Sequence, residues 1–408
     1  MRDLAQTSKS FFRTSRYILF WLSSLFSNIG TWMQQVAQPW VVLSLTNSAF
    51  WVGLDGFAMN APGWIFTLFG GVLADRYDRR KTVLLFQAIQ FLCVVTMVIL
   101  LVVGWLKVWM IVTISFMVGL TDSLSMPSFQ SIMPSLVEKK EIGKAVSLNS
   151  TQFNLSRILG PAIAGIVIVR FGAIVCFSAN AASYIPFFLS LYFIYPRKKL
   201  KTSALPIEAK LIEQLKEFKS LLLNVEVRLP LMIVLVSSMF CAPIITFCAV
   251  LIKNVFHAEV TNFGGAVAAF GIGGLIGSAT SFMTLPKLKG NKFASITAIL
   301  LGLAIVGIAL NHSIYILITL LVIAGAALTA SNISINTSLQ ENVAENIRGR
   351  IVSLYQLALS GGISIGALFT GFMVTQLNIS KALLINGIAA ILFQVWLLFK
   401  QRKIFDNK

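Results

Sequence analysis

The sequence predicts an all-α membrane protein with twelve transmembrane helices, and two observations carry this prediction. Hydrophobic residues make up 57% of the 408-residue chain and charged residues only 12%, and the apolar residues gather in runs of about 20 that recur from end to end. As a helix, such a run crosses a hydrocarbon layer of roughly 30 Å. The second half of the chain also repeats features of the first. We therefore expect two six-helix halves.

The spans are expected to be helices because backbone groups inside a membrane must be satisfied within the spanning structure, and these runs are about twice as long as a barrel strand needs. The first run follows four basic residues and is too long for the hydrophobic part of a signal peptide, so we expect it to remain as the first span. The twelve expected spans are 17–45, 50–73, 82–104, 108–127, 147–170, 174–195, 229–252, 263–285, 293–310, 314–336, 351–376 and 382–400.

Basic residues predict the orientation, because Lys and Arg near the ends of spans prefer the cytoplasmic side. If the N-terminus is cytoplasmic, 28 of the 33 Lys and Arg residues fall in cytoplasmic segments, four fall on the other side, and Arg157 alone lies inside a span. We expect both termini in the cytoplasm. The same distribution explains the net charge of +18 without nucleic acid as a partner, since the charges lie in short turns.

An internal repeat divides the chain. The segment Gly143-Lys-Ala-Val-Ser-Leu-Asn149 before span 5 matches Gly349-Arg-Ile-Val-Ser-Leu-Tyr355 before span 11 at an offset of 206 residues, which also places Gly165 on Gly371. Six spans in each half make the repeat parallel, as in the two halves of some transporters. We expect an N-terminal half at 1–195, a cytoplasmic linker at 196–228 and a C-terminal half at 229–408. The linker is expected to hold an amphipathic surface helix, with a plain tether as the alternative role.

Charge is concentrated between spans 2 and 3, where six of the seven residues from Asp75 to Lys81 are charged. Orientation needs only a few basic residues, so the acids need another reason. Asp75 can accept bonds from the N-terminus of a neighbouring helix, and the arginines can pair with carboxylates or with helix C-terminal ends. We expect such contacts to hold helices together in one conformation and to release them in another. The candidate residues are Gly71, for close backbone approach, and Asp75, Arg76, Asp78, Arg79 and Arg80.

The stretch Gly71-Val-Leu-Ala-Asp-Arg-Tyr-Asp-Arg-Arg-Lys81 resembles the loop 2–3 signature of the major facilitator superfamily, with Asp78 where a second glycine is usual. The Asp-Arg-x-Asp-Arg-Arg version is similar to that of a branch of bacterial exporters that includes the enterobactin exporter and the macrolide efflux proteins. Residues 126–136, 145–149, 156–165 and 348–354 resemble the same branch. The resemblance therefore covers both halves.

The resemblance implies roles for residues inside the spans. Gly160, Pro161 and Gly165 resemble the span 5 motif of antiporters, although no second glycine follows Gly165; a static packing notch is the alternative. Spans 1, 4, 7 and 10 border the central pathway in this superfamily, so polar residues there are candidates for its lining, with hydrogen bonds between helices as the alternative. The lining candidates are Asn28, Trp32, Gln35, Asn332 and Asn336, with Tyr355 and Gln356 at the start of span 11.

Three ionisable residues lie inside the predicted spans, where a charge is costly unless it is paired or faces water. Asp122 and Arg157 both lie roughly 20 Å from the outer ends of spans 4 and 5. We predict an ion pair between them that binds a charged substrate group or opens when Asp122 takes a proton; a static structural pair is the alternative. Asp55, about two turns into span 2, is either an outward-side proton acceptor or a solvated acid near the helix start.

These features predict a secondary transporter that works by alternating access, with two halves that rock about a central site. We expect an ion gradient, with protons the natural choice, as the driver, and neither a cofactor nor a metal. The resemblance implies export of a siderophore, a drug or another amphipathic small molecule; import of a siderophore or lysolipid is the alternative. A receptor or an enzyme is the remote alternative, because the spans lack convincing clusters of catalytic groups. We expect a monomer surrounded by lipid, without enzyme activity.

Overall fold

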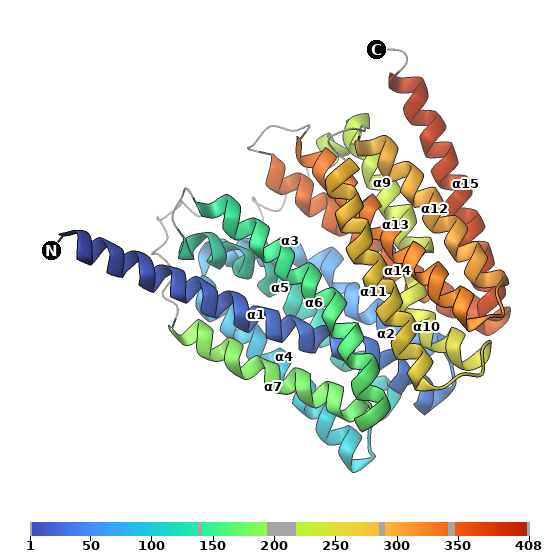
Figure 1. The fold of residues 1–408 in the computed structure, drawn as a ribbon, viewed down its shortest axis with the longest axis horizontal. Helices are drawn as coiled ribbons and strands as arrows, with labels where there is room; N and C mark the ends of the chain where they lie inside the picture. The colour runs from blue at the N-terminus through green and yellow to red at the C-terminus, as the bar shows by residue number, and fades with distance from the viewer. Residues whose placement is uncertain (1, 138–140, 194–217, 285–289, 342–346, 406–408) are drawn as a thin grey trace.

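The structure, a computed structural model, describes residues 2–137, 141–193, 218–284, 290–341 and 347–405. Every regular element in these ranges is an α-helix. The helices form two bundles that meet along one side and diverge toward the other (Figure 1). The predicted all-α class is confirmed.

The N-terminal bundle has one broken span. Pro62 begins a new helix directly after the turn at Ala61, because proline has no N–H to continue the hydrogen-bond pattern of the preceding helix. Predicted span 2 is therefore two short helices. The helices of this half are α1 (Arg2–Thr46), α2 (Ala49–Asn60), α3 (Pro62–Arg76), α4 (Arg79–Val103), α5 (Val108–Leu136), α6 (Ile142–Phe171) and α7 (Ala173–Phe193).

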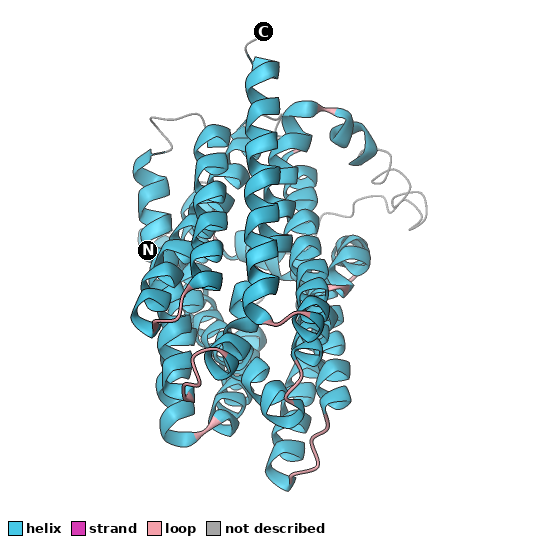
Figure 2. Ribbon diagram, turned by 90° about the vertical axis from the view of Figure 1, so that its right-hand side faces the viewer, coloured by secondary structure: helices cyan, strands magenta, loops and turns pink. Residues whose placement is uncertain are grey.

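The C-terminal bundle is broken once as well. Pro243 starts a new helix after Cys241 and Ala242, so predicted span 7 is also made of two pieces. The helices of this half are α9 (Val225–Phe240), α10 (Pro243–Asn254), α11 (Val260–Thr284), α12 (Gly290–Leu310), α13 (Ile314–Glu341), α14 (Arg348–Gln376) and α15 (Ile379–Phe405). Figure 2 shows these helices running beside one another.

Ten segments of the described chain are long and apolar enough to cross a membrane. They correspond to predicted spans 3 to 12. Span 1 lies in α1, which carries several amide side chains between residues 28 and 38, and span 2 is divided into helices of 12 and 15 residues. Neither segment is among the ten. The count of twelve spans therefore stays a prediction.

Most of the predicted linker helix lies outside the described residues. Its last part is described: residues 218–223 are helical, and the side chain of Phe218 is buried in a hydrophobic core formed by the C-terminal half.

The hydrophobic cores show where the halves meet. One core contains residues of both halves, among them Val41 and Val52 from the first and Phe247 and Phe263 from the second. Two other cores each draw on a single half: one lies around Phe20 and Ile132, and the other lies around residues 218–397. We call the side of the shared core the junction side. The opposite side, to which α1 and α15 extend with the chain ends, is the terminal side (Figure 1).

Glycines bring backbones of the two halves into contact at the junction side. A Cβ on Gly53 of α2 would lie 2.5 Å from the Ala367 carbonyl oxygen and 3.0 Å from the Gly371 Cα of α14. A Cβ on Gly165 of α6 would lie 2.7 Å from the Gly264 Cα of α11. Real side chains cannot come so close, so these crossings require glycine. Two helix pairs, α2–α14 and α6–α11, thus hold the halves together.

Candidate functional site

The charged turn at residues 76–81 binds the ends of neighbouring helices. The Arg79 Nη1 donates to the Ser131 carbonyl oxygen of α5 at 3.3 Å, and the Arg80 Nη2 donates to the Tyr192 carbonyl oxygen of α7 at 2.6 Å. Tyr192 lies in the last turn of α7 and Ser131 in the turn before the last of α5, near the helix ends where the dipole is negative. The arginines therefore tie the start of α4 to two helices of the same half. Carboxylates and helix C-terminal ends were the two kinds of partner predicted for them, and these contacts are of the second kind.

Asp78 has a local role in this turn. Its carboxylate caps α4 by accepting a hydrogen bond from the Lys81 backbone N–H at 2.9 Å. Arg76 and Tyr77 are exposed. The side chain of Asp75, the acid expected to bind a helix N-terminus, lies outside the described residues, so that expectation stays a prediction.

The expected close approach occurs one residue before Gly71. A Cβ on Gly71 would meet nothing within 4 Å, whereas a Cβ on Gly70 would lie 2.6 Å from the Ser123 carbonyl oxygen of α5. The assignment of this role to Gly71 is therefore wrong in this conformation. Successive helical residues differ by about 100° in direction, so a shift of one residue turns the contact to a different face of α3.

Arg157 lies near the centre of α6 beside aromatic side chains. Its guanidinium carbon is 5.6 Å from the centre of the Trp32 ring of α1. Tyr355 of α14, in the other half, lies within electrostatic range of the Arg157 guanidinium. The Tyr355 hydroxyl donates to the Asn332 backbone oxygen of α13 at 3.4 Å. Arg157 thus stacks on an indole of its own half, and the phenol in the other half that lies within its electrostatic range is buried.

The predicted ion pair between Asp122 and Arg157 is not formed in this conformation. Among the residues that the structure describes, neither side chain has a partner of opposite charge, and Arg157 stacks on Trp32 instead. Asp122 lies halfway along α5 and is exposed. Exposure of a carboxylate to lipid at mid-membrane depth is costly, so the exposed face is best explained by an aqueous space.

The other lining candidates differ in exposure. Gln35 is exposed, while Asn28, Trp32, Asn336 and Gln356 are partly exposed, and Tyr355 is buried. Asn336 accepts a hydrogen bond from Gln340 at 2.9 Å. Both residues lie on α13, so this bond is formed within one helix, whereas the alternative to a lining role was a bond between helices. The Oδ1 of Asn332 is buried without a partner among the described atoms. A buried amide oxygen without a protein partner needs a hydrogen bond from a ligand or from water.

The span 5 motif is a packing feature in this conformation. Gly160 lies against the backbone and Cβ of Trp32, so that α6 crosses α1 closely, and Gly165 lies against Gly264 of the other half. Pro161 lies inside α6 without ending it. The motif therefore sets how α6 meets both α1 and the opposite half.

Asp55 is buried in a hydrogen-bonded network, with only 5% of its surface exposed. The Gln38 Nε2 donates to both carboxylate oxygens at 2.9 and 2.8 Å, and the Ser115 hydroxyl donates to Oδ1 at 2.5 Å. The interpretation of Asp55 as a solvated acid is therefore wrong. The position of Asp55 near the start of span 2 predicted that it lies close to water, but α1 and α5 cover it.

Family membership follows from the match over nearly the whole chain. The family model described as "Transmembrane secretion effector", of the major facilitator superfamily, matches residues 6–407. This chain belongs to that family. It is a membrane transporter rather than an enzyme, and the sequence resemblance is confirmed.

Relatives of this transporter share its length at low identity. The staphyloferrin A transporter of Staphylococcus aureus is 24% identical over 394 residues, which cover 94% of this chain and 96% of that protein. The enterobactin exporter EntS of Salmonella typhi is 24% identical over 382 residues, covering 92% and 90% of the two chains. Macrolide efflux protein A of Streptococcus pyogenes is 21% identical over 383 residues, covering 91% and 92%.

Solved transporter structures share the fold. A point mutant of the nucleoside transporter NupG aligns with a TM-score of 0.77 at 12% identity, covering 95% of this chain and 98% of that one. A bacterial homologue of the human lysosomal transporter Spinster aligns with a TM-score of 0.76 at 14% identity, covering 97% and 98%. At these identities the likeness shows the fold alone.

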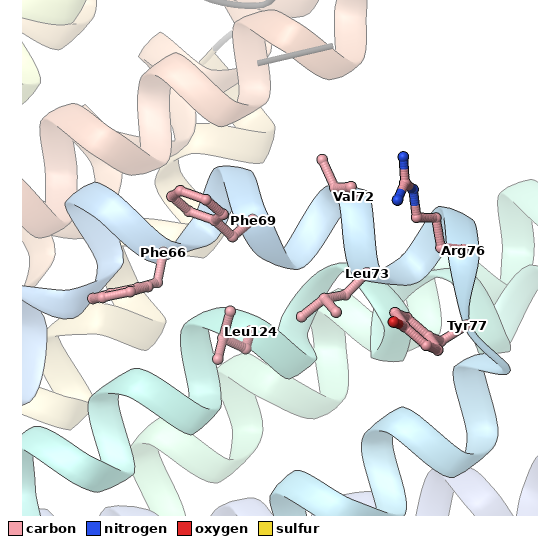
Figure 3. Close-up of a pocket in the computed structure, with 7 residues that line it drawn as sticks. All are labelled: Phe66, Phe69, Val72, Leu73, Arg76, Tyr77 and Leu124. Carbon is pink, nitrogen blue, oxygen red and sulfur yellow. The ribbon is translucent and has the colours of Figure 1, made fainter. Parts of the chain in front are cut away.

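A small apolar pocket of about 250 Å³ lies beside the charged turn of the transporter. Leu73 points toward Leu124 of α5, while Arg76 points away from α5 (Figure 3). Five of the seven residues that line the pocket are apolar, so it offers mainly hydrophobic contact area. Its lining residues are Phe66, Phe69, Val72, Leu73, Arg76, Tyr77 and Leu124.

Several site residues of the transporter were not predicted. Gln38 and Ser115 hold Asp55, and Gly53 and Gly264 form the crossings between halves. One signal was present in the sequence: Gln34 and Gln38 stand four residues apart in an apolar run, so both lie on one face of α1. Buried amides need partners, and this pattern indicates a buried polar network.

Proposed function

We propose that this transporter exports a small amphipathic molecule carrying an anionic group, in exchange for protons, across a bacterial inner membrane. The terminal side is the cytoplasmic side in this proposal. The charged turn at residues 76–81 lies there, and the distribution of Lys and Arg supports the assignment. The structure then corresponds to a state that is closed at the periplasmic junction side.

The observation that carries the proposal is the Arg157 guanidinium, which lies over Trp32 and has no carboxylate partner in the described part of the chain. A charge at this depth is costly unless it faces water or binds a counter-charge. A substrate anion supplies that charge, and the partly exposed ring of Trp32 offers contact to an apolar or aromatic body. The site therefore suits a molecule with both features.

The arrangement of the cores supports alternating access. The halves share one core at the junction side and have separate cores at the terminal side. Opening the junction side means separating the α2–α14 and α6–α11 crossings, and closing the terminal side means bringing the two separate cores together. Arg157 lies between these ends, near the middle of α6, within electrostatic range of Tyr355 of the other half. A substrate held there would be exposed to each side in turn.

The names of two relatives support a siderophore-type cargo, since one is a staphyloferrin A transporter and another an enterobactin exporter. We infer that the anionic groups of a metal-free siderophore are what Arg157 binds. The geometry does not impose a direction, so export is tested directly against import.

The test uses membrane vesicles of both orientations with an imposed proton gradient. A panel of metal-free carboxylate and catechol siderophores, a macrolide and a lysolipid is offered to each. Export predicts accumulation of an anionic cargo in inside-out vesicles that are acidic inside, with loss in Arg157→Gln. Arg170→Gln is the matched control, because Arg170 is exposed at the end of the same helix. Accumulation only in right-side-out vesicles would establish import, and equal transport by Arg157→Gln would remove the anion site.

A further inference from the structure

We propose that Asp55, together with Gln38 and Ser115, is the proton-binding site of the transporter, and that its protonation controls the α2–α14 contact at the junction side. This inference rests on the proposed function, because it names the group that carries the exchanged proton. It differs from the anion site around Arg157, which lies on α6 and faces the other half.

The carboxylate of Asp55 is held by neutral groups. The Gln38 Nε2 reaches both of its oxygens and also the Ser115 Oγ at 2.7 Å, while the Ser115 hydroxyl donates to Oδ1. These three side chains come from α2, α1 and α5. Gln38 and Ser115 are buried, as is Asp55 itself. A carboxyl group that is closed off from water and held by an amide and a hydroxyl is balanced by hydrogen bonds but not by charge.

Charged and titratable groups on the helices packed against α2 lie away from Asp55. Asp122 is seven residues beyond Ser115 on α5, and Lys253 at the end of α10 donates instead to Asn47 at 2.8 Å. The remaining groups with described side chains on these helices are Arg16 and Tyr17 of α1, Arg76 of α3, the thiols of Cys241 and Cys248 beside and on α10, and Arg350 and Tyr355 of α14. Asp55 has hydrogen bonds with Gln38 and Ser115 but no charged partner in the described part of the chain.

Both protonation states can be satisfied at this site. The charged form accepts hydrogen bonds from Gln38 and Ser115. When a proton binds, the new O–H can donate to the Ser115 oxygen, which releases the serine hydroxyl from its bond to Asp55, and Gln38 can keep one bond to the other oxygen. The proton adds to a carboxylate oxygen, and no other bond is broken. A buried group of this kind changes its local bonding when it takes up a proton.

The network extends beyond these three side chains. Gln34 Nε2 donates to the Gln38 Oε1 at 3.2 Å, and Asn180 Nδ2 of α7 donates to the Gln34 Oε1 at 2.6 Å. Four helices of the N-terminal half are thereby joined in one chain of hydrogen bonds. A change in the hydrogen bonds of Asp55 therefore affects side chains on α1, α5 and α7 as well as on α2.

The neighbours of Asp55 on α2 form the contact with the other half. Gly53 lies against Ala367 and Gly371 of α14, and a Cβ on Gly56 would be 3.2 Å from the Ala367 Cβ. Because α2 has only 12 residues and ends at the break before Pro62, a change on its Asp55 face also moves its glycine face. Protonation of Asp55 thus acts where the junction side must open.

The test has two readouts on the full-length transporter in liposomes. The first is the infrared C=O band of a protonated carboxyl group during a pH titration, which needs no substrate. The second is accumulation of cargo driven by a pH gradient. Asp55→Asn is compared with Glu259→Gln, which neutralises an exposed acid outside the network.

We expect Asp55→Asn to lose one titrating carboxyl band and to reduce accumulation to the level reached without a gradient, while Glu259→Gln accumulates cargo like the wild type. Ser115→Ala keeps the carboxyl group, and we expect it to shift the midpoint of the same band, which keeps the test informative if Asp55→Asn fails to fold. An unchanged band in Asp55→Asn, an unchanged midpoint in Ser115→Ala, or normal accumulation by Asp55→Asn overturns the inference. A wild type that shows the Asp55 band but transports no cargo contradicts the proposed function instead.

Discussion

Gly165 of α6 and Gly264 of α11 lie backbone against backbone, so that a Cβ on Gly165 would be 2.7 Å from the Gly264 Cα. The first glycine belongs to the N-terminal half and the second to the C-terminal half. The repeat offset of 206 places Gly165 on Gly371, and Gly371 makes the corresponding crossing with Gly53. The internal repeat therefore relates the two crossings, because Gly165 and Gly371 occupy equivalent positions in the two halves. We take the two crossings as the contacts that close the junction side.

A methyl group at the Gly165–Gly264 crossing should separate α6 from α11 there. Gly264→Ala places a Cβ inside the Gly165 backbone, and overpacking of this kind costs about 1–3 kcal/mol. We expect the variant to populate the state open at the junction side and to slow transport. The measurement is the reaction rate of a cysteine introduced near the crossing with a water-soluble reagent. Gly265→Ala is the control, since a Cβ there meets nothing within 4 Å; equal rates in both variants would contradict the role of the crossing.

Adjacent glycines in α3 should respond differently to the same substitution. Gly70→Ala drives a methyl group into the Ser123 and Leu124 backbone of α5, whereas Gly71→Ala meets open space. We expect Gly70→Ala to lower the thermal unfolding midpoint and Gly71→Ala to leave it unchanged or raise it slightly, because alanine favours the helix by roughly 0.5–1 kcal/mol. The reverse order of midpoints would show that Gly71 faces a neighbour.

Arg80 should contribute to the stability of the N-terminal half. Arg80→Ala removes its bond to the Tyr192 carbonyl and its place 5.8 Å from the Tyr192 ring centre. A hydrogen bond from a charged group contributes about 1.5–3 kcal/mol, so we expect a clearly lower midpoint in thermal unfolding. Lys81→Ala is the comparison, because the Lys81 side chain is exposed. Equal midpoints would mean that the Arg80 contact does not stabilise this end of the bundle.

The predicted Asp122–Arg157 pair is tested by a double-mutant cycle in transport rate. If the pair forms in the opposite conformation, the double variant Asp122→Asn with Arg157→Ala loses less activity than the product of the two single losses. A coupling of about 1.4 kcal/mol would make that difference tenfold. Losses that simply multiply would remove the pair from the mechanism.

Much of the fold could be predicted because hydropathy reports directly on the solvent around a helix. Spans 3 to 12 follow from apolar runs alone, and the repeat identifies Gly165 and Gly371 as equivalent. The partners Gly264 and Gly53 could not be predicted in the same way. Which glycine meets which depends on how the halves pack, and that is set by contacts between residues far apart in the chain.

The site was harder to predict, because side-chain direction decides it. Depth along the span was the evidence for placing Asp55 near water, but Gln38 and Ser115 cover it from other helices. Depth likewise placed Asp122 and Arg157 at one level, yet Arg157 turns to Trp32. Periodicity within one helix gives a face, and only the packing of its neighbours shows what that face meets.

The most direct test of the central claim is a pair of distance distributions measured by pulsed electron paramagnetic resonance in a cysteine-free background. One pair of spin labels, at Ser48 and Asn254, reports the junction side beside the Lys253–Asn47 contact; another, at Tyr77 and Glu341, reports the terminal side. Alternating access predicts opposite changes when pH or cargo is varied, the first distance growing as the second shrinks. Distances that stay fixed, or that grow together, would contradict it.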